Sequence, residues 1–195
     1  MIGRRLSCLS SRRISRRMRL TAALLTLVLA VPVVAQAQPK PKPAKPRVAA
    51  AAGPAELGKF DDWIAATHQE SGQTTCYAFV RAKHSVPAVP GRGEVALTVT
   101  QRPTGRDWVA ISVGFSFGKD ATVTMQVDTT GLDFYTAQSN AFARDGQAAV
   151  AAFQSGQEVL ARSTGPRDGR TVVDTFSLRG FSAAYAAITK ACPAR

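Results

Sequence analysis

The sequence predicts a mainly β protein: an antiparallel, β-sandwich-like single domain with two short helices. Three observations support this prediction. From Glu56 onward, several runs alternate between apolar and polar residues, which is the pattern of half-buried strands in an antiparallel sheet. Turn sequences rich in Gly, Asp and Thr separate these runs. Only two segments repeat their apolar residues at helical spacing instead.

Alternation of side chains justifies each strand. In Glu94–Arg102, the side chains of Val95, Leu97 and Val99 share one face, and small or polar residues occupy the other. Trp108–Phe117 alternates in the same way, which places Ser116 inside a strand. The remaining predicted strands are Thr75–Arg81, Ala121–Val127, Leu132–Thr136, Val159–Ser163 and Thr171–Ser177.

Turn chemistry predicts how these strands connect. Gly118-Lys119-Asp120 is expected to join its two flanking strands tightly, and Thr129-Thr130-Gly131 to join the next pair. Gly165–Arg170 contains Asp168-Gly169 and predicts a hairpin between the last two strands.

Two helices complete the domain. The first is predicted over Gln147–Gln154, after Asp145-Gly146, and its alanines suit close packing on a sheet. The second is predicted over Phe181–Ala191 and is stopped by Pro193. Its apolar face carries Phe181, Tyr185, Ile188 and Cys192, at spacings of four, three and four.

The amino terminus has the three parts of a signal peptide. Seven arginines lie in the first nineteen residues, the apolar run Leu20–Val34 follows, and Ala35-Gln36-Ala37 offers a cleavage site after Ala37. A retained membrane anchor is the alternative, but the run is shorter than the ~20 residues that span a bilayer. Two questions stay open: whether translation starts at Met1 or at Met18, and whether export uses the Sec or the twin-arginine pathway. We therefore expect a periplasmic or secreted protein with no transmembrane segment after cleavage.

The net charge of +12 misleads if the chain is taken as a whole. Removal of residues 1–37 leaves 18 basic against 13 acidic residues, and four of those basic residues lie in a Pro/Lys/Ala-rich linker, residues 38–55. Residues 56–195, the predicted β domain, are nearly neutral, so a nucleic-acid partner is not expected. The composition of the linker predicts an extended, solvated tether that could also contact an anionic envelope weakly.

Only Cys76 and Cys192 remain after signal removal, and an exported chain with two cysteines most simply pairs them in a disulfide. Such a bond would tie the first predicted strand to the carboxyl terminus. The two tryptophans, Trp63 and Trp108, are expected in the core, although an exposed Trp could also serve a carbohydrate or protein surface.

No catalytic, cofactor-binding or metal-binding residues are assigned. Gly114–Gly118 matches the G-x-S-x-G nucleophile motif, but a strand surrounds Ser116 in our prediction, another strand follows, and both histidines precede it, against the order of that motif. No metal-ligand spacing and no glycine-rich phosphate loop is present. If the domain acted on cell wall or polysaccharide, the first candidates would be Asp61, Asp62, His68 and His84.

Several short motifs resemble one family. They are Phe60-Asp61-Asp62-Trp63, Thr75-Cys76-Tyr77-Ala78, Arg102-Pro103, the closing Phe176-Ser177-Leu178-Arg179-Gly180-Phe181-Ser182-Ala183-Ala184, and Cys192-Pro193. Across about residues 57–193 the chain is similar to the invasion-associated locus B family of exported bacterial proteins. The resemblance implies a secreted or envelope-located β domain without known catalytic residues, and it supplies no functional site.

The function predicted from these observations is that of a non-catalytic exported protein. Its expected partner is a macromolecule of the envelope or of a host surface, and a link to host-cell interaction would apply if the source is a pathogen. A structural envelope protein and a periplasmic enzyme of unrecognised type remain the alternatives.

Overall fold

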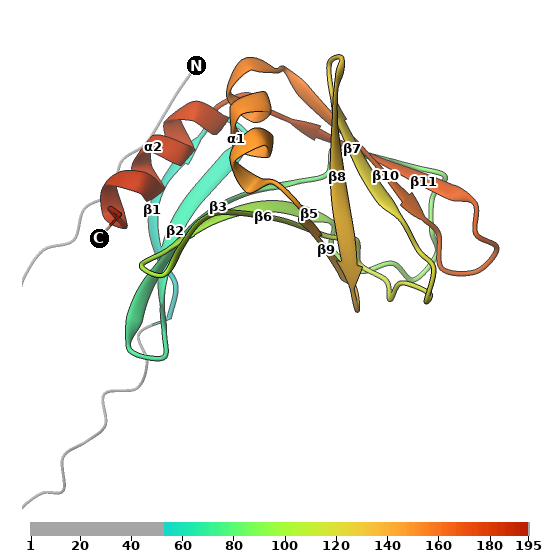
Figure 1. The fold of residues 1–195 in the computed structure, drawn as a ribbon, viewed down its shortest axis with the longest axis horizontal. Coiled ribbons are helices and arrows are strands. Elements are labelled where there is room, and N and C mark those ends of the chain that lie inside the picture. Colours follow the sequence, from blue (N-terminus) through green and yellow to red (C-terminus); the bar gives the residue numbers. More distant parts are fainter. Residues whose placement is uncertain (1–52, 195) are drawn as a thin grey trace, which may run out of the picture. The chain divides into compact units, whose positions relative to one another are not determined.

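The computed structural model describes residues 53–194, so the predicted signal peptide and nearly all of the linker lie outside the described part. Eleven strands and two helices make up this part (Figure 1). They are β1 (Ala55–Phe60), β2 (Trp63–Glu70), β3 (Gln73–Arg81), β4 (His84–Val86), β5 (Ala96–Arg102), β6 (Gly105–Ser112), β7 (Val123–Val127), β8 (Thr130–Ala137), β9 (Asn140–Ala143), α1 (Gly146–Ser155), β10 (Glu158–Thr164), β11 (Thr171–Ser177) and α2 (Phe181–Ala191).

The strands form one sheet in the order β1-β2-β3-β5-β6-β9-β8-β7-β10-β11-β4, and every neighbouring pair is antiparallel. This confirms the mainly antiparallel β class with two helices in one domain. The layers are made by bending a single sheet. Strands from both halves, such as β5 and β7, point alternate side chains into one shared core that includes Leu97, Val99, Val123 and Met125.

A corner between β3 and β4 brings the two ends of this sheet order together. The backbone of Ala82 donates to the carbonyl of Val95, beside β5, at 3.0 Å, and the next residue, Lys83, donates to the carbonyl of Thr175 in β11 at 2.8 Å. The chain therefore leaves one half of the sheet and joins the other within two residues. The bent sheet encloses its core because this corner connects its third strand to its last.

Both helices cover the core. The carboxylate of Asp145 caps α1 by accepting a hydrogen bond from the Ala148 amide at 2.9 Å, and α1 packs on β6 and β8. The second helix lies across β1, β2 and β3 (Figure 1). Its predicted apolar face is confirmed: Phe181 and Ile188 are fully buried, Cys192 nearly so, and Tyr185 is partly buried against the core.

Most predicted strands are confirmed within two or three residues at either end, but the segment after β6 is not. We predicted a strand over Trp108–Phe117; it ends at Ser112, and Gly114 has a left-handed φ of 72°. The tight connection at Gly118–Asp120 is also wrong, because β6 pairs with β9 whereas β7 pairs with β8. Strands β1, β2, β4 and β9 were not predicted from the sequence.

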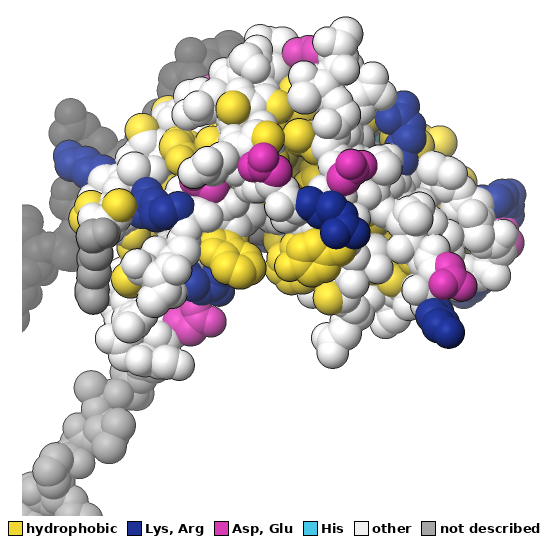
Figure 2. Space-filling view, in the orientation of Figure 1, with side chains coloured by type: hydrophobic (Ala, Val, Ile, Leu, Met, Phe, Trp, Pro, Cys, Tyr) yellow, Lys and Arg dark blue, Asp and Glu magenta, His cyan; other side chains and the backbone are white. Residues whose placement is uncertain are grey.

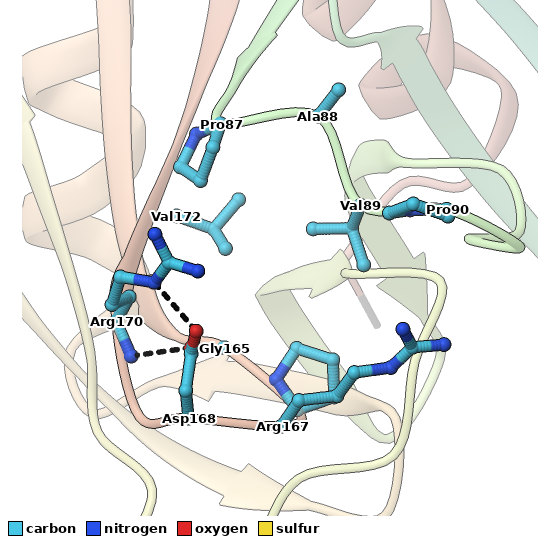
Figure 3. A pocket seen from close by; sticks show the side chains of 10 residues that line it. Pro87, Ala88, Val89, Pro90, Gly165, Arg167, Asp168, Arg170 and Val172 are labelled. Atoms are coloured by element: carbon cyan, nitrogen blue, oxygen red, sulfur yellow. Dashed lines mark hydrogen bonds and ion pairs between the residues drawn. The ribbon is translucent and has the colours of Figure 1, made fainter.

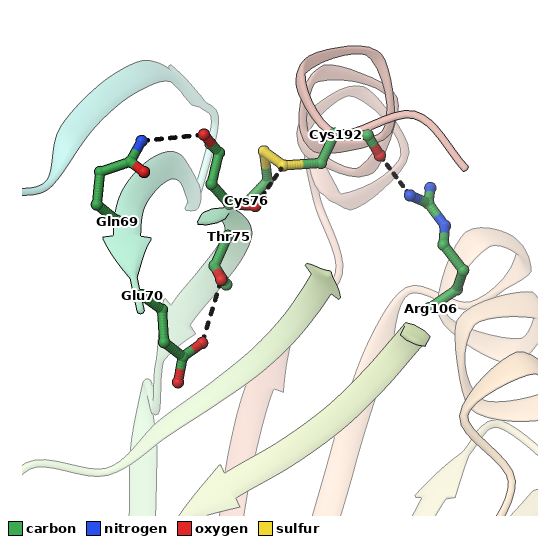
Figure 4. Close-up of a disulfide and its surroundings, with 7 residues drawn as sticks. Gln69, Glu70, Thr75, Cys76, Arg106 and Cys192 are labelled. Carbon is green, nitrogen blue, oxygen red and sulfur yellow. Dashed lines mark hydrogen bonds between the residues drawn. A yellow bond between two sulfur atoms is a disulfide. The ribbon is translucent and has the colours of Figure 1, made fainter. Parts of the chain in front are cut away.

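Cys76 and Cys192 are joined by a disulfide with a Cα–Cα distance of 6.0 Å (Figure 4). Cys76 lies in β3 and Cys192 caps the end of α2, so the bond fastens the last helix to the sheet. Nearby, the Arg106 guanidinium donates a hydrogen bond to the Cys192 carbonyl (Figure 4). The helix end is thus held by one covalent and one polar contact.

A buried ion pair fixes the long loop between β4 and β5. The Arg92 guanidinium donates to both carboxylate oxygens of Asp174 in β11, at 2.8 and 2.7 Å, and its Nε donates to the Val113 carbonyl at 2.5 Å. The Ser85 hydroxyl also donates to Asp174, at 2.6 Å. The Arg92 side chain is only 6% exposed and that of Asp174 is fully buried. Because water solvates neither charge well, each is stabilised by the other.

Candidate functional site

The face of the sheet that points away from the core carries five aromatic residues on neighbouring strands. Cross-strand partners in an antiparallel sheet lie on the same face. One row across β3, β5 and β6 contains Tyr77, Thr100 and Trp108. A second row, continuing into β9 and β8, contains Phe79, Thr98, Ala110, Phe142 and Tyr135.

These two rows define a groove, which we call the aromatic groove. Its floor is formed by the small side chains of Thr98, Thr100 and Ala110. One wall is Tyr77 and Phe79 from β3, and the other is Trp108, Phe142 and Tyr135. Adjacent strands lie about 4.8 Å apart, so the backbones of Tyr77 and Trp108 are roughly 10 Å apart and those of Phe79 and Phe142 roughly 14 Å.

Trp108 is the most exposed large aromatic residue of the groove. We expected it in the core beside Trp63; Trp63 is fully buried, whereas Trp108 is 48% exposed. A Cβ placed on Gly105 would lie 2.4 Å from the indole nitrogen, so the N–H edge of the indole lies against this glycine. The core expectation for Trp108 is wrong because β6 turns this side of its alternating pattern outward.

Aromatic contacts order both walls. The Tyr77 ring stacks on Phe79 at a centroid distance of 6.1 Å and meets His68 edge-on at 5.5 Å. On the opposite wall, Tyr135, which is 42% exposed, stacks on Phe142 at 5.5 Å. The Arg144 guanidinium lies over the Tyr135 ring, 5.9 Å from its centroid.

Charged side chains at the ends of the groove are paired with each other. The Arg102 guanidinium donates to Glu70 at 2.9 Å, and Arg81 pairs with Glu94. Hydrogen bonds from Arg102 and then from the Thr75 hydroxyl lower the pKa of Glu70 below its usual value. Glu70 is therefore ionised at neutral pH, and its charge is matched by Arg102.

A wide, open hollow of about 540 Å³ lies on this face, lined by Tyr77, Thr98, Thr100, Arg102 and His68 together with Gln69, Gly53 and Pro54. Its volume falls within the range of small-molecule and oligomer sites, about 300 to 1,000 Å³. Figure 2 shows two compact groups of hydrophobic side chains facing each other across a narrow gap, where the surface is hollowed. A basic side chain lies against one of these groups.

The four residues named as enzyme candidates do not come together. Asp61 and Asp62 form the turn between β1 and β2, and His68 lies in the hollow on the outer face. His84 is exposed in β4, paired in register with Thr175. Asp62 and His68 are six residues apart along an extended strand, roughly 20 Å. The geometry thus offers no acid–base pair among them.

Asp62 instead belongs to a junction between the two ends of the domain. The Ser177 hydroxyl and then the Lys83 ammonium, 3.2 Å away, lower the pKa of this carboxyl below its usual value. The Asp62 amide donates to the Arg179 carbonyl at 3.4 Å, and the Trp63 indole nitrogen donates to the Ser177 carbonyl at 2.9 Å.

The same junction explains the most specific motif of the sequence. Gly180 has a φ of 87°, and a Cβ there would lie 2.0 Å from the Phe60 carbonyl oxygen. Directly after it, Phe181 packs on Trp63 with ring centroids 4.8 Å apart. The Phe60–Trp63 and Ser177–Phe181 motifs are therefore structural: they seat α2 on the sheet.

The G-x-S-x-G match at Gly114–Gly118 also lacks the context of a nucleophile. Ser116 is exposed in the loop after β6, so our statement that it lies inside a strand is wrong. Two other reasons against a nucleophile still apply: strand β7 follows Ser116 where the motif requires a helix, and no histidine comes later in the chain.

A second, smaller cavity of about 160 Å³ lies between the loops that follow β4 and β10 (Figure 3). Pro87, Val89, Pro166 and Val172 supply its apolar lining, and Arg170 on its rim is paired with Asp168 at 2.5 Å. Its volume is below the usual range of ligand sites. We therefore give precedence to the outer face of the sheet, where the larger hollow lies beside Tyr77.

Among residues 53–194, no group of three or more His, Cys, Asp or Glu side chains is placed to hold a metal ion. Within the same residues, no helix is long and apolar enough to cross a membrane.

Trp108 and His68 were singled out from the sequence as possible functional residues, and the other groove residues were not. Tyr77, Phe79, Tyr135 and Phe142 could have been found by asking which aromatic residues occupy the polar positions of alternating strands. That signal is weak here because β3 is apolar on both faces, so its two sides cannot be told apart locally.

The chain is similar to known proteins in sequence and in fold. The model of the family described as "Invasion associated locus B (IalB) protein" matches residues 63–189. No curated protein matches significantly. The crystal structure of invasion associated protein B from Bartonella henselae is similar in fold, with a TM-score of 0.50 and 18% sequence identity over 69% of this chain and 95% of that one. Because the family match spans more than half of the chain and most of the described domain, the chain belongs to the invasion associated locus B family.

Proposed function

We propose that this protein is an exported, non-catalytic binding protein that holds a macromolecular partner in the aromatic groove. The observation that carries the proposal is the exposure of Trp108 and Tyr135 on a continuous outer face. Exposed apolar patches of this kind are characteristic of interaction sites, and Trp and Tyr supply much of the energy of such contacts. The separation of the four acid and histidine candidates gives the enzymatic alternative no comparable support.

Export to the periplasm or the medium is part of the proposal. It is supported by the amino-terminal pattern of residues 1–37, by the disulfide between Cys76 and Cys192, and by membership of the family. The partner would then be a component of the envelope, or of a host surface if the source is a pathogen. The basic linker would add weak, salt-sensitive contact with anionic envelope components.

Site-specific photocrosslinking tests the binding site. A photoreactive amino acid is placed at Trp108 or Tyr135 of the full chain, expressed in its source bacterium, and cells and medium are irradiated. We expect adducts of higher mass from both positions. Val86 is the matched control, because it is 66% exposed in β4, outside the groove. Equal adducts from Val86, or none from the two groove positions, would contradict the proposed site.

A further inference from the structure

We propose that two copies of this protein pair through β1, the first strand of the sheet, to form a two-fold symmetric dimer. This surface lies outside the aromatic groove, so the dimer does not depend on the proposed function. Three features of β1 support it: the free edge of the strand, the face that its two charged side chains share, and the order of those charges along the strand.

Strand β1 has a hydrogen-bonded neighbour on one side only. It pairs with β2 and stands first in the strand order. Among residues 53–194, its backbone makes no hydrogen bond to any other segment, and four of its six residues are exposed. Unpaired amides and carbonyls along a strand edge are a template for another strand. The opposite end of the sheet is less suitable, because β4 has only three residues and Pro87 follows it.

A bulge in β1 turns two opposite charges to the same face of the sheet. Glu56 lies opposite Ala66 of β2. Lys59 lies opposite Ile64, and the register shift between these two pairs marks one extra residue in β1. Since Ala66 and Ile64 are two residues apart, they and their partners point to one side, whereas residues 56 and 59 of a regular strand would point to opposite sides. That side is the outer face, because Ala66 also lies opposite Tyr77 of β3.

The charges of β1 are complementary to themselves when two copies of the strand run antiparallel. A two-fold axis through the middle of the strand sets Glu56 of each copy opposite Lys59 of the other, so two ion pairs form at once. Opposite charges on directly facing residues stabilise an antiparallel pair. The exposed Leu57 then lies opposite Gly58 of the other copy, which has no side chain to obstruct it. Within residues 53–194, neither Glu56 nor Lys59 forms an ion pair, so both charges are available to a second copy.

A second copy fits this edge better than an unrelated strand does. A bulge and a lysine commonly protect an edge strand from pairing. Here the lysine meets a glutamate of the same sequence, and the bulge brings both side chains to one face. A strand without this order of charges would leave one or both of them unmatched. Because the contact involves only the six residues of β1 from each copy, we expect a weak dimer, of the class that buries less than about 1,200 Å².

Sedimentation equilibrium on the full chain, as processed by its source bacterium, measures the association. We expect a monomer–dimer equilibrium with a dissociation constant between roughly 1 μM and 1 mM at about 0.1 M salt. Glu56→Lys places a lysine opposite Lys59 of the other copy, and Lys59→Glu places a glutamate opposite Glu56. Each variant turns two attractions into two repulsions and should raise the dissociation constant by about tenfold or more. Lys119→Glu is the matched control, because Lys119 is exposed in the loop after β6, and it should behave like the unaltered protein.

A mixture of the Glu56→Lys and Lys59→Glu proteins tests the register of the pair. In a mixed dimer, two lysines of one copy face two glutamates of the other, whereas each variant alone brings like charges together. We expect the mixture, and also the double variant Glu56→Lys/Lys59→Glu, to dimerise about as strongly as the unaltered protein. A urea unfolding curve for each variant separates lost association from lost folding.

Two results would overturn the inference. The first is a protein that stays monomeric at concentrations up to about 1 mM. The second is a dimer that neither single variant weakens, or whose association the mixture fails to restore, since the contact would then lie elsewhere on the domain.

Discussion

Loss of the Cys76–Cys192 disulfide should remove a large part of the stability of the domain. The two cysteines are 116 residues apart, so the bond restricts most of the unfolded chain. For a loop of this length, the chain-entropy relation gives about 5 kcal/mol at 25 °C. Domains of this size have free energies of unfolding of only about 5 to 15 kcal/mol, so the reduced protein is expected to be marginally stable.

Urea unfolding of the Cys76→Ala/Cys192→Ala double variant measures this contribution. With a denaturant dependence of about 2 kcal/mol per M, a loss of about 5 kcal/mol moves the midpoint by about 2.5 M. The emission of the fully buried Trp63 should follow the transition. Reductant should lower the urea midpoint of the unaltered protein by nearly the same amount and should leave the midpoint of the double variant unchanged. A midpoint shift below about 0.5 M would refute the loop-entropy reasoning and show that α2 is held by packing alone.

Three further predictions test the interior. Asp174→Ala leaves the Arg92 charge buried without its partner and should lower the free energy of unfolding by about 3 to 5 kcal/mol, measured in urea. Burial, and then the hydrogen bond that Tyr185 donates to Asp107 at 2.7 Å, raise the pKa of Tyr185. Its contribution to stability is therefore complete below the unfolded pKa near 10 and is lost as pH rises through the folded value. Gly146→Ala would place a methyl group 1.8 Å from the Asp107 carbonyl oxygen and should lower the melting temperature by several degrees.

Each of these predictions has a matched control. Replacement of both members of the buried pair, as Arg92→Met/Asp174→Leu, should cost less than Asp174→Ala alone. In an ultraviolet titration, Tyr185→Phe should remove an ionisation that occurs above the usual tyrosine range; if its removal left the alkaline end of the curve unchanged, the assignment would be wrong. Gly118→Ala has open space around its Cβ and should leave the melting temperature almost unchanged. Equal effects at Gly118 and Gly146 would contradict the steric argument.

Local sequence patterns predicted the strands and helices that bury one face and expose the other. Strand β11 and helix α2 were predicted with their observed bounds. In both, the spacing of the apolar residues within the segment is enough to indicate the type of element. The β10–β11 hairpin followed for the same reason, since its turn residues and its two strands are adjacent in the chain. Strand β2 was missed because Ile64 and Ala66 make its outer side as apolar as its inner side.

Composition, periodicity and turn residues were enough to predict the fold class, both helices, the segments that form most strands, and the pair of cysteines available for a disulfide. The strand order, in which β6 lies beside β9 and the corner after β3 joins the two ends of the sheet, depends on long-range pairing and was not predictable from local patterns. The tertiary structure also decided that Trp108 faces solvent and lies in one groove with Tyr77 and Tyr135. The physical reason is that a groove across five strands depends on the register of pairs far apart in the chain. A shift of one residue in any of these pairs would turn its aromatic residues to the other face.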